Sequence, residues 1–154
     1  MSDQIDARLS ALGLSLPDAP APAANYVPYV QSGSLVFISG QVAKKGDALI
    51  CGQLGTDTDI EGGYAAARAC GLNLVAQLKA ACGGDLGRLR RVVKLTGFVN
   101  AAPDFTDHPK VMNGASDLMV ALFDDAGRHA RAAVGSPSLP GGVAVEVEGI
   151  FEID

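Results

Sequence analysis

The sequence predicts a single α+β domain in which two helices lie on one face of a mixed β-sheet. Two segments repeat apolar residues at helical spacing, and several shorter ones are rich in the apolar and β-branched residues of strands. Their order is strand, strand, short strand, helix, strand, helix, strand, strand. Because each helix must bury its apolar stripe, placing both on one sheet face is the economical arrangement. A chain of 154 residues with 48% hydrophobic and 19% charged residues can form such a core and is not disordered.

An N-terminal extension precedes this core. Residues 4–13 space apolar side chains as one helical stripe and end in glycine. Residues 16–28 then contain four prolines, which exclude a helix and favour an extended path over the surface. We therefore predict one domain over residues 1–154, in which residues 1–23 form an added helix and a Pro/Ala-rich connector.

The first half of the core is predicted to contain strands followed by a long helix. Residues 29–33 and 34–42 indicate two short strands around a turn, and residues 48–50 indicate a third. Between Asp59 and Cys82, apolar and small residues recur at steps of three and four until two glycines end the pattern. This is the clearest helix of the sequence.

The second half repeats the pattern of strand and helix. Residues 90–100 are apolar on both faces, as expected of a central strand. A second helix is predicted from His108 to Ala126, with Pro109 in its first turn. Residues 130–136 and 142–153 are predicted strands, and their closeness in the sequence favours a hairpin between them.

Charge and composition exclude several function classes. The 12 basic and 17 acidic residues give a net charge of −5, which argues against a nucleic-acid partner. Two histidines are too few for a histidine-based metal site, and no H-E-x-x-H motif is present, so metal catalysis is not expected. No apolar stretch approaches the about 20 residues of a membrane helix, and the N-terminus lacks a signal-peptide pattern. Three cysteines without a C-x-x-C pair suit the reducing cytoplasm, and Cys82, at a helix end, is expected to be the most reactive.

Four polar positions leave a structural and a functional interpretation open. Glu146 and its neighbours Glu148 and Glu152 share one face of the last strand, which is either solvated or part of a groove between subunits. Arg131, in a small apolar run, either protects an edge strand from aggregation or grips a carboxylate. Ser39 ends a strand where a ligand could bind, although no nearby histidine would activate it. Asn113 falls outside the apolar stripe of its helix, which favours simple exposure.

Five segments together carry a family resemblance. They are V-P-Y-V-Q (27–31), F-I-S-G-Q (37–41), V-V-K-L-T-G-F-V-N (92–100), A-R-A-A-V (130–134) and L-P-G-G-V-A-V-E-V-E (139–148). In this order they resemble the RidA/YjgF family, also called the endoribonuclease L-PSP family, over residues 24–153. The N-terminal helix and connector resemble a longer-chain subgroup.

The resemblance implies a chorismate-mutase-like fold and a homotrimer with ligand clefts between subunits. In that fold the last strand lies centrally, between the first core strand and the strand after the first long helix. This arrangement replaces the hairpin expected from local sequence.

The resemblance also assigns roles to particular residues. Arg131 falls on the arginine that grips the substrate carboxylate, and Glu146 on the glutamate thought to position water. Tyr29, Ser39 and Asn113 fall on further substrate-binding positions. The sequence departs from the family at Ala133, where many members have cysteine, at His129, where proline is frequent, and at the unusual Pro137.

The implied activity is the cofactor-independent hydrolysis of reactive 2-imino acids or their enamine tautomers to 2-keto acids and ammonia. The alternative is a trimer that binds small carboxylate metabolites without catalysis. A third possibility is an endoribonuclease, against which the acidic charge, the few aromatic residues and the lack of a histidine pair all count.

Overall fold

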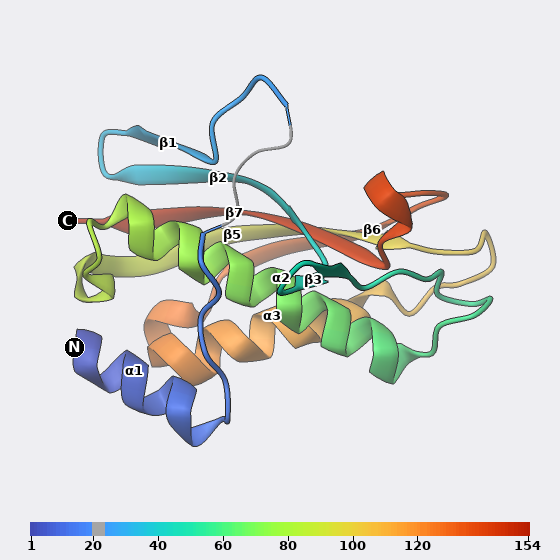
Figure 1. The fold of residues 1–154 in the computed structure, drawn as a ribbon, viewed down its shortest axis with the longest axis horizontal. Coiled ribbons are helices and arrows are strands. Elements are labelled where there is room, and N and C mark those ends of the chain that lie inside the picture. Colours follow the sequence, from blue (N-terminus) through green and yellow to red (C-terminus); the bar gives the residue numbers. More distant parts are fainter. Residues whose placement is uncertain (20–23) are drawn as a thin grey trace.

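The computed structural model describes residues 1–19 and 24–154 and shows helices on one side of a five-stranded sheet (Figure 1). The helices are α1 (Ser2–Ala11), α2 (Ile60–Ala81) and α3 (His108–Phe123). The main sheet contains β1 (Tyr29–Ser32), β2 (Leu35–Val42), β5 (Leu89–Asn100), β6 (Ala130–Ser136) and β7 (Val145–Ile153), and β3 (Lys44–Lys45) pairs with β4 (Ala48–Leu49) in a small hairpin. The predicted α+β class is confirmed. Part of the predicted connector, residues 20–23, lies outside the described residues.

The strand order is β1-β2-β7-β5-β6. Strand β7 is antiparallel to both of its neighbours, whereas β5 and β6 run parallel. The hairpin expected between residues 130–136 and 142–153 is therefore wrong, and the central position implied by the family resemblance is confirmed. The physical reason is burial, because alternate β7 residues from Val145 to Ile153 are fully enclosed and need a strand on each side. On one side, however, the neighbour of β7 is the second strand, β2, and not the first core strand.

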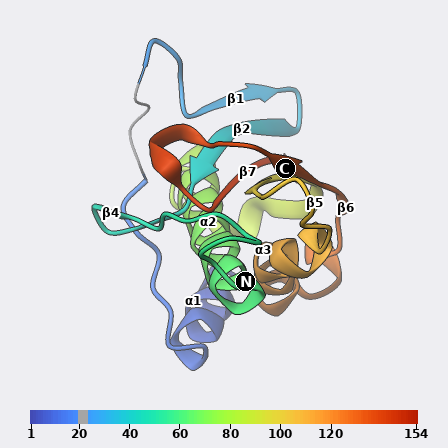
Figure 2. The ribbon, with the colours of Figure 1, turned by 90° about the vertical axis from the view of Figure 1, so that its right-hand side faces the viewer.

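The layers are visible edge-on in Figure 2, with α2 and α3 beneath the sheet and α1 further out. The α2 helix begins where the Asp59 carboxylate accepts a hydrogen bond of 2.7 Å from the Gly62 backbone N–H. Its predicted end before two glycines is confirmed. The α3 helix ends at Phe123, three residues before the prediction, because Asp124 adopts a positive φ of 51° and a short 3₁₀ turn follows.

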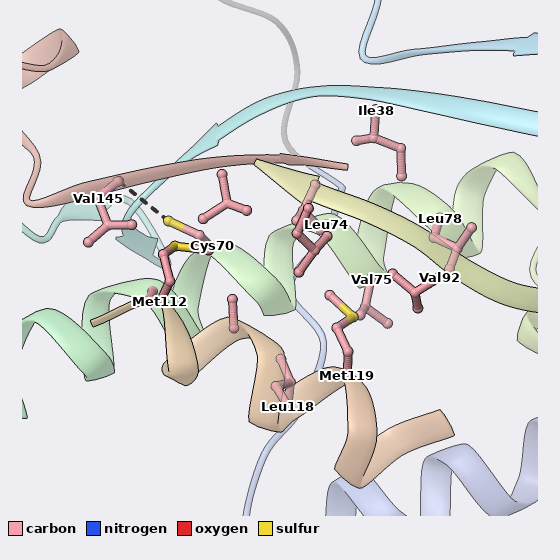
Figure 3. Close-up of a cluster of buried hydrophobic side chains, with 14 of the residues drawn as sticks. Ile38, Cys70, Leu74, Val75, Leu78, Val92, Met112, Leu118, Met119 and Val145 are labelled. Atoms are coloured by element: carbon pink, nitrogen blue, oxygen red, sulfur yellow. Dashed lines mark hydrogen bonds between the residues drawn. The ribbon is translucent and has the colours of Figure 1, made fainter. Parts of the chain in front are cut away.

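The core fills the space between the sheet and the two long helices (Figure 3). Its buried side chains include Cys70, Leu74, Val75 and Leu78 from α2, Met112, Leu118 and Met119 from α3, and Ile38, Val92 and Val145 from the sheet. Helix α1 adds Ile5 and Leu9 to this core, and Arg8 donates a 2.7 Å hydrogen bond to the Leu122 carbonyl oxygen. Helix α1 is therefore packed on α3.

Gly114 lies where α3 crosses α2. A Cβ at this position would overlap the Tyr64 carbonyl oxygen and come within 3.1 Å of the Arg68 backbone nitrogen. Because both obstacles are helix backbone, they cannot rotate away. We expect Gly114→Ala to lower the free energy of unfolding by about 2–3 kcal/mol, measured by urea denaturation.

Gly62→Ala is the matched control for this variant, since it also changes a helical glycine. Its Cβ would meet only side-chain atoms of Asp59 and Thr58, at 3.1 and 3.2 Å. We expect a change below about 1 kcal/mol. If Gly114→Ala were as stable as the wild type, the close helix crossing would be contradicted.

The three cysteines differ in exposure from the expectation. Cys82 is only 2% exposed and Cys70 is fully buried, whereas Cys51 is exposed. Burial raises the pKa of both enclosed thiols. The prediction that Cys82 is the most reactive is therefore wrong, because its helix end is covered. All three are free thiols in the described part of the chain.

Candidate functional site

Arg131 lies on the edge strand β6, and its side chain extends to the helix-covered side of the sheet. One terminal nitrogen, Nη1, donates to Asn113 Oδ1 at 2.9 Å and to Ser116 Oγ at 3.1 Å, both on α3. The other, Nη2, is 3.5 Å from the Pro109 carbonyl oxygen. The structure thus brings together two predicted residues, Arg131 and Asn113. Asn113 is engaged with the arginine through its side-chain oxygen.

The guanidinium of Arg131 is surrounded by neutral acceptors. Within residues 1–19 and 24–154, none of the ion pairs involves this arginine. The side chain is half-buried, so its charge is only partly exposed to water. A fixed cation without an internal anion is suited to bind an external carboxylate.

Ser116 and His129 extend this cluster. Ser116 Oγ lies 2.9 Å from His129 Nε2, and His129 Nδ1 lies 2.6 Å from the Gly127 carbonyl oxygen. Burial lowers the pKa of His129, the neighbouring Arg131 charge lowers it further, and the contact with Gly127 opposes them. Sequence reasoning missed Ser116. Its spacing of three residues from Asn113 on one helix was the available signal.

Glu146 lies on the opposite, uncovered face of the sheet. Its neighbours across the ladder are Val42 of β2 and Phe98 of β5. The carboxylate packs against Gly40, where a Cβ would overlap it. Burial, and then the charge of Glu148, raise the pKa of Glu146. A carboxylate with a raised pKa is a suitable proton acceptor near neutral pH.

Ser39 and Tyr29 belong to the β1–β2 end of the sheet. Ser39 lies in an irregularity of β2 next to Gly40, and its hydroxyl donates to the Val27 carbonyl oxygen at 2.9 Å. Tyr29 is half-buried against the core and pairs with Ile38 in register. Ser39 therefore precedes the glycine that packs against Glu146, and in residues 1–19 and 24–154 neither Ser39 nor Tyr29 is hydrogen-bonded to the arginine cluster.

The predicted residues do not form one site within a single chain. Arg131 pairs with Leu95 and Glu146 with Phe98, three residues further along β5. Because side chains alternate along a strand, Arg131 and Glu146 point to opposite faces. Tyr29 lies on β1, at the other sheet edge from β6 and about 19 Å away at normal strand spacing.

Two of the hollows formed by the described residues lie away from these side chains. One, of about 330 Å³, lies between α1, the start of β5 and the end of α3. The other, of about 400 Å³, lies between the segment after α1, the β3 hairpin and α2. Neither is lined by Arg131, Glu146, Tyr29, Ser39 or Asn113.

The uncovered sheet face carries exposed apolar side chains. Val30, Phe37 and Val134 are 53%, 43% and 44% exposed. Val30 pairs with Phe37, which pairs in turn with Ile150 of β7, and Val134 pairs with Phe98. These residues therefore share a face with Glu146, and the single chain leaves them in contact with water.

Residues 1–19 and 24–154 hold no group of three or more His, Cys, Asp or Glu side chains placed to bind a metal ion. No helix within them has the length and apolar character needed to cross a membrane.

Comparisons with known proteins agree with the fold and with the sequence resemblance. Residues 6–149 match the family model described as "YjgF/chorismate_mutase-like, putative endoribonuclease". Protein TCP17 of Trypanosoma cruzi is 50% identical over 155 residues, covering 99% of this chain and 96% of its own. The structure of Atu1372 from Agrobacterium tumefaciens, described as a protein of unknown function, has 47% identity and a TM-score of 0.94, covering 99% of this chain and 94% of its own.

A more distant relative has a ligand. The crystal structure of TdcF from E. coli contains bound serine, with 27% identity, a TM-score of 0.60, and coverage of 88% of this chain and 94% of its own. The family model spans nearly the whole sequence, and the fold neighbours share the strand and helix arrangement described above. The chain therefore belongs to the RidA/YjgF family, the YjgF/chorismate mutase-like group of proteins.

Proposed function

We propose that this chain is a cofactor-independent deaminase that hydrolyses reactive 2-imino acids, or their enamine tautomers, to 2-keto acids and ammonia. The observation that carries the proposal is Arg131, a half-buried guanidinium fixed by Asn113 and Ser116 without an internal carboxylate in the described residues. Such a group suits the carboxylate that every 2-imino acid carries. The bound serine of E. coli TdcF, a small molecule with a carboxylate, supports the same ligand class.

The proposed chemistry needs one anchor, one water and one base. Arg131 holds the substrate carboxylate, which fixes the position of the adjacent imine carbon. Glu146 accepts a proton from water as the water oxygen bonds to that carbon. As the carbon–nitrogen double bond opens, this proton is returned to the nitrogen, which gives a carbinolamine. Glu146 then transfers the remaining hydroxyl proton to the same nitrogen while the carbon–nitrogen bond breaks, so that both water protons leave with ammonia and the oxygen becomes the carbonyl of the keto acid. In this proposal Asn113 orients the anchor, while Ser39 and Tyr29 line the substrate cleft.

This mechanism requires a second copy of the chain. Because Arg131 and Glu146 face opposite sides of one sheet, the pair can meet across a cleft only if different subunits supply them. We propose a homotrimer whose interface covers the uncovered sheet face, including Phe37. The apolar exposure of that face, 43% at Phe37 and 44% at Val134, supports this proposal.

The trimer gives a prediction for sedimentation. The wild-type protein is expected to have three times the 15.7 kDa mass of one chain. Phe37→Glu is expected to shift the population towards monomer, because it places a charge inside the apolar interface. Leu12→Glu, at a residue with similar exposure of 48% at the end of α1, is the control and is expected to remain trimeric. A monomeric wild type would contradict the intersubunit cleft.

A coupled assay tests the proposed activity. A pyridoxal-phosphate-dependent dehydratase generates the 2-imino acid in solution, and the loss of imine and the release of keto acid are followed over time. Added protein is expected to accelerate imine loss above the spontaneous rate in proportion to its concentration. An unchanged rate at all concentrations would reject the deaminase.

A second candidate is a trimer that binds small carboxylate metabolites without catalysis. It is favoured by the fact that Arg131, Asn113 and Ser116 form their cluster without any contact to Glu146. The ribonuclease activity named in the family description is less compatible with a net charge of −5. For either candidate we propose a cytoplasmic setting, in keeping with the free thiols.

A further inference from the structure

We propose that Ser116 and His129 are positioning residues that fix the orientation of Arg131, and thereby decide which edge of its guanidinium receives the ligand carboxylate. The inference rests on the proposed role of Arg131 as the anchor. Its evidence is a continuous chain of polar contacts from the Gly127 carbonyl through His129 and Ser116 to Arg131.

The donor and acceptor in each of these hydrogen bonds follow from the Gly127 carbonyl oxygen. The Gly127 carbonyl oxygen can only accept a hydrogen bond, so His129 Nδ1, at 2.6 Å, must carry a proton and donate it. In the neutral ring Nε2 is then an acceptor. Ser116, at 2.9 Å, therefore donates its hydroxyl proton to Nε2.

The orientation of Ser116 in turn defines the acceptor for Arg131. With its hydrogen directed to His129, Ser116 Oγ presents its lone pairs, and Arg131 Nη1 donates to it at 3.1 Å. The second Nη1 hydrogen is donated to Asn113 Oδ1 at 2.9 Å. Both hydrogens of this nitrogen are thus committed to α3, and the plane of the guanidinium is fixed by two contacts.

The remaining donors of Arg131 form one edge. Nη2 has only a long contact of 3.5 Å, to the Pro109 carbonyl oxygen. The hydrogens of Nε and Nη2 lie side by side on the edge opposite Nη1, and this edge matches the two oxygens of a carboxylate. Ser116 and His129 therefore leave a side-on, bidentate site for a carboxylate. Without them, Arg131 would keep its charge, but the guanidinium edge formed by Nε and Nη2 would no longer have a fixed orientation.

The first measurement tests the series of hydrogen bonds from Gly127 to Arg131 directly and requires no ligand. Imidazole ¹⁵N–¹H NMR spectra distinguish the two neutral tautomers of histidine, and His129→Gln assigns the signals because His108 is the only other histidine. We expect His129 to carry its proton on Nδ1 with Nε2 unprotonated at neutral pH. A proton on Nε2 instead would overturn the inference.

The second measurement is the affinity for pyruvate, a small 2-keto acid, by titration calorimetry on the intact assembly. Ser116→Ala is expected to weaken binding about tenfold, the effect of losing one hydrogen bond to a charged group. Ser116→Thr keeps the hydroxyl and is expected to restore affinity to within about threefold of the wild type. His129→Phe removes the acceptor of Ser116 and the donor to the Gly127 carbonyl but leaves the Ser116 hydroxyl in place, so it is expected to cause a smaller loss than Ser116→Ala.

Controls separate this inference from the proposed function. Ser10→Ala changes an exposed helical serine on α1 and is expected to leave pyruvate affinity unchanged. In the imine assay, Ser116→Ala is expected to raise KM and leave kcat near the wild-type value, since it acts on binding and not on Glu146.

The outcomes that contradict the two proposals differ. If Arg131→Ala loses pyruvate binding while Ser116→Ala binds as tightly as the wild type, the positioning role is rejected and the anchor stands. If Arg131→Ala binds pyruvate normally, the anchor is rejected, and the tautomer of His129 still decides whether the chain of contacts exists.

Discussion

Arg131→Ala is expected to abolish measurable binding of small 2-keto acids and to reduce imine hydrolysis to the spontaneous rate. The guanidinium is held by Asn113 and Ser116, and Nη2 makes a further long contact of 3.5 Å to Pro109, so the substitution removes the cation that the described residues place in this cluster. Truncating a charged partner in a partly buried site costs at least about 2 kcal/mol, which is a loss of about thirtyfold or more in affinity. Titration calorimetry with pyruvate and the coupled imine assay measure the two effects.

Arg131→Lys separates charge from geometry. Lysine keeps the positive charge but has no planar fork, and it cannot reproduce the two contacts made by Nη1. We therefore expect it to recover little of the binding. Arg128→Ala is the matched control, since Arg128 is an exposed arginine of the same region that pairs with Asp125. Normal binding and rate in Arg131→Ala would return this residue to the alternative role of an edge-strand charge.

The elements with a local sequence signal were predictable. The long helix after Asp59 has a capping residue, a continuous apolar stripe and terminal glycines, and the structure follows all three. The alternation of β7 likewise placed Val147 and Phe151 in the core and Glu146 and Glu148 on the other face. In both cases the period of the pattern is set by the geometry of a single element.

Long-range pairing was not predictable from the same patterns. The parallel pairing of β6 with β5 and the central position of β7 depend on contacts between segments that are distant in sequence. The family resemblance supplied the central position of β7 but not the parallel pairing of β6 with β5, and local sequence favoured a hairpin. The exposure of Cys51 and the burial of Cys82 depend in the same way on which distant segments cover them.

The site was predictable only in part for a related reason. The resemblance named Arg131 and Asn113, which the structure places 2.9 Å apart, but it gave no indication of Ser116. It also gave no indication that Arg131 and Glu146 face opposite sides of one sheet. That relation follows from the register of β5 with its two neighbours, which appears only when the sheet is assembled.

Glu146→Gln is expected to lower kcat for imine hydrolysis about a hundredfold or more, the usual effect of removing a general base. Glutamine keeps the shape of the side chain, and Arg131 is untouched, so the affinity for pyruvate is expected to stay near the wild-type value. Glu152→Gln, on the same face of β7, is the matched control and is expected to change neither quantity. Equal losses of affinity and rate would instead place Glu146 among the groups that hold the ligand.

Glu146→Gln is also expected to change the thermal stability of the protein. Burial and Glu148 raise the pKa of Glu146 above its ordinary value of 4.5, so the folded state binds this proton more tightly than the unfolded state. The resulting stabilisation is present below pH 4.5 and is lost as the pH rises through the raised pKa. Glutamine is neutral at every pH and avoids the loss. We therefore expect Glu146→Gln to melt above the wild type at pH 7, by about 2–4 °C for each kcal/mol recovered, and to show a smaller advantage near pH 4.

The two measurements on Glu146→Gln together separate the candidate functions. A base that is retained for catalysis explains why a charged carboxylate stays on a half-buried face beside Glu148, where it costs stability. A deaminase therefore predicts a variant that is more stable and much slower but binds pyruvate normally. A metabolite-binding trimer predicts the same gain in stability with no rate to lose, because the wild type would not accelerate imine loss. A variant that melts below the wild type at pH 7 would show that the Glu146 charge is stabilised in the assembly, and the cationic partner would then have to come from a neighbouring subunit.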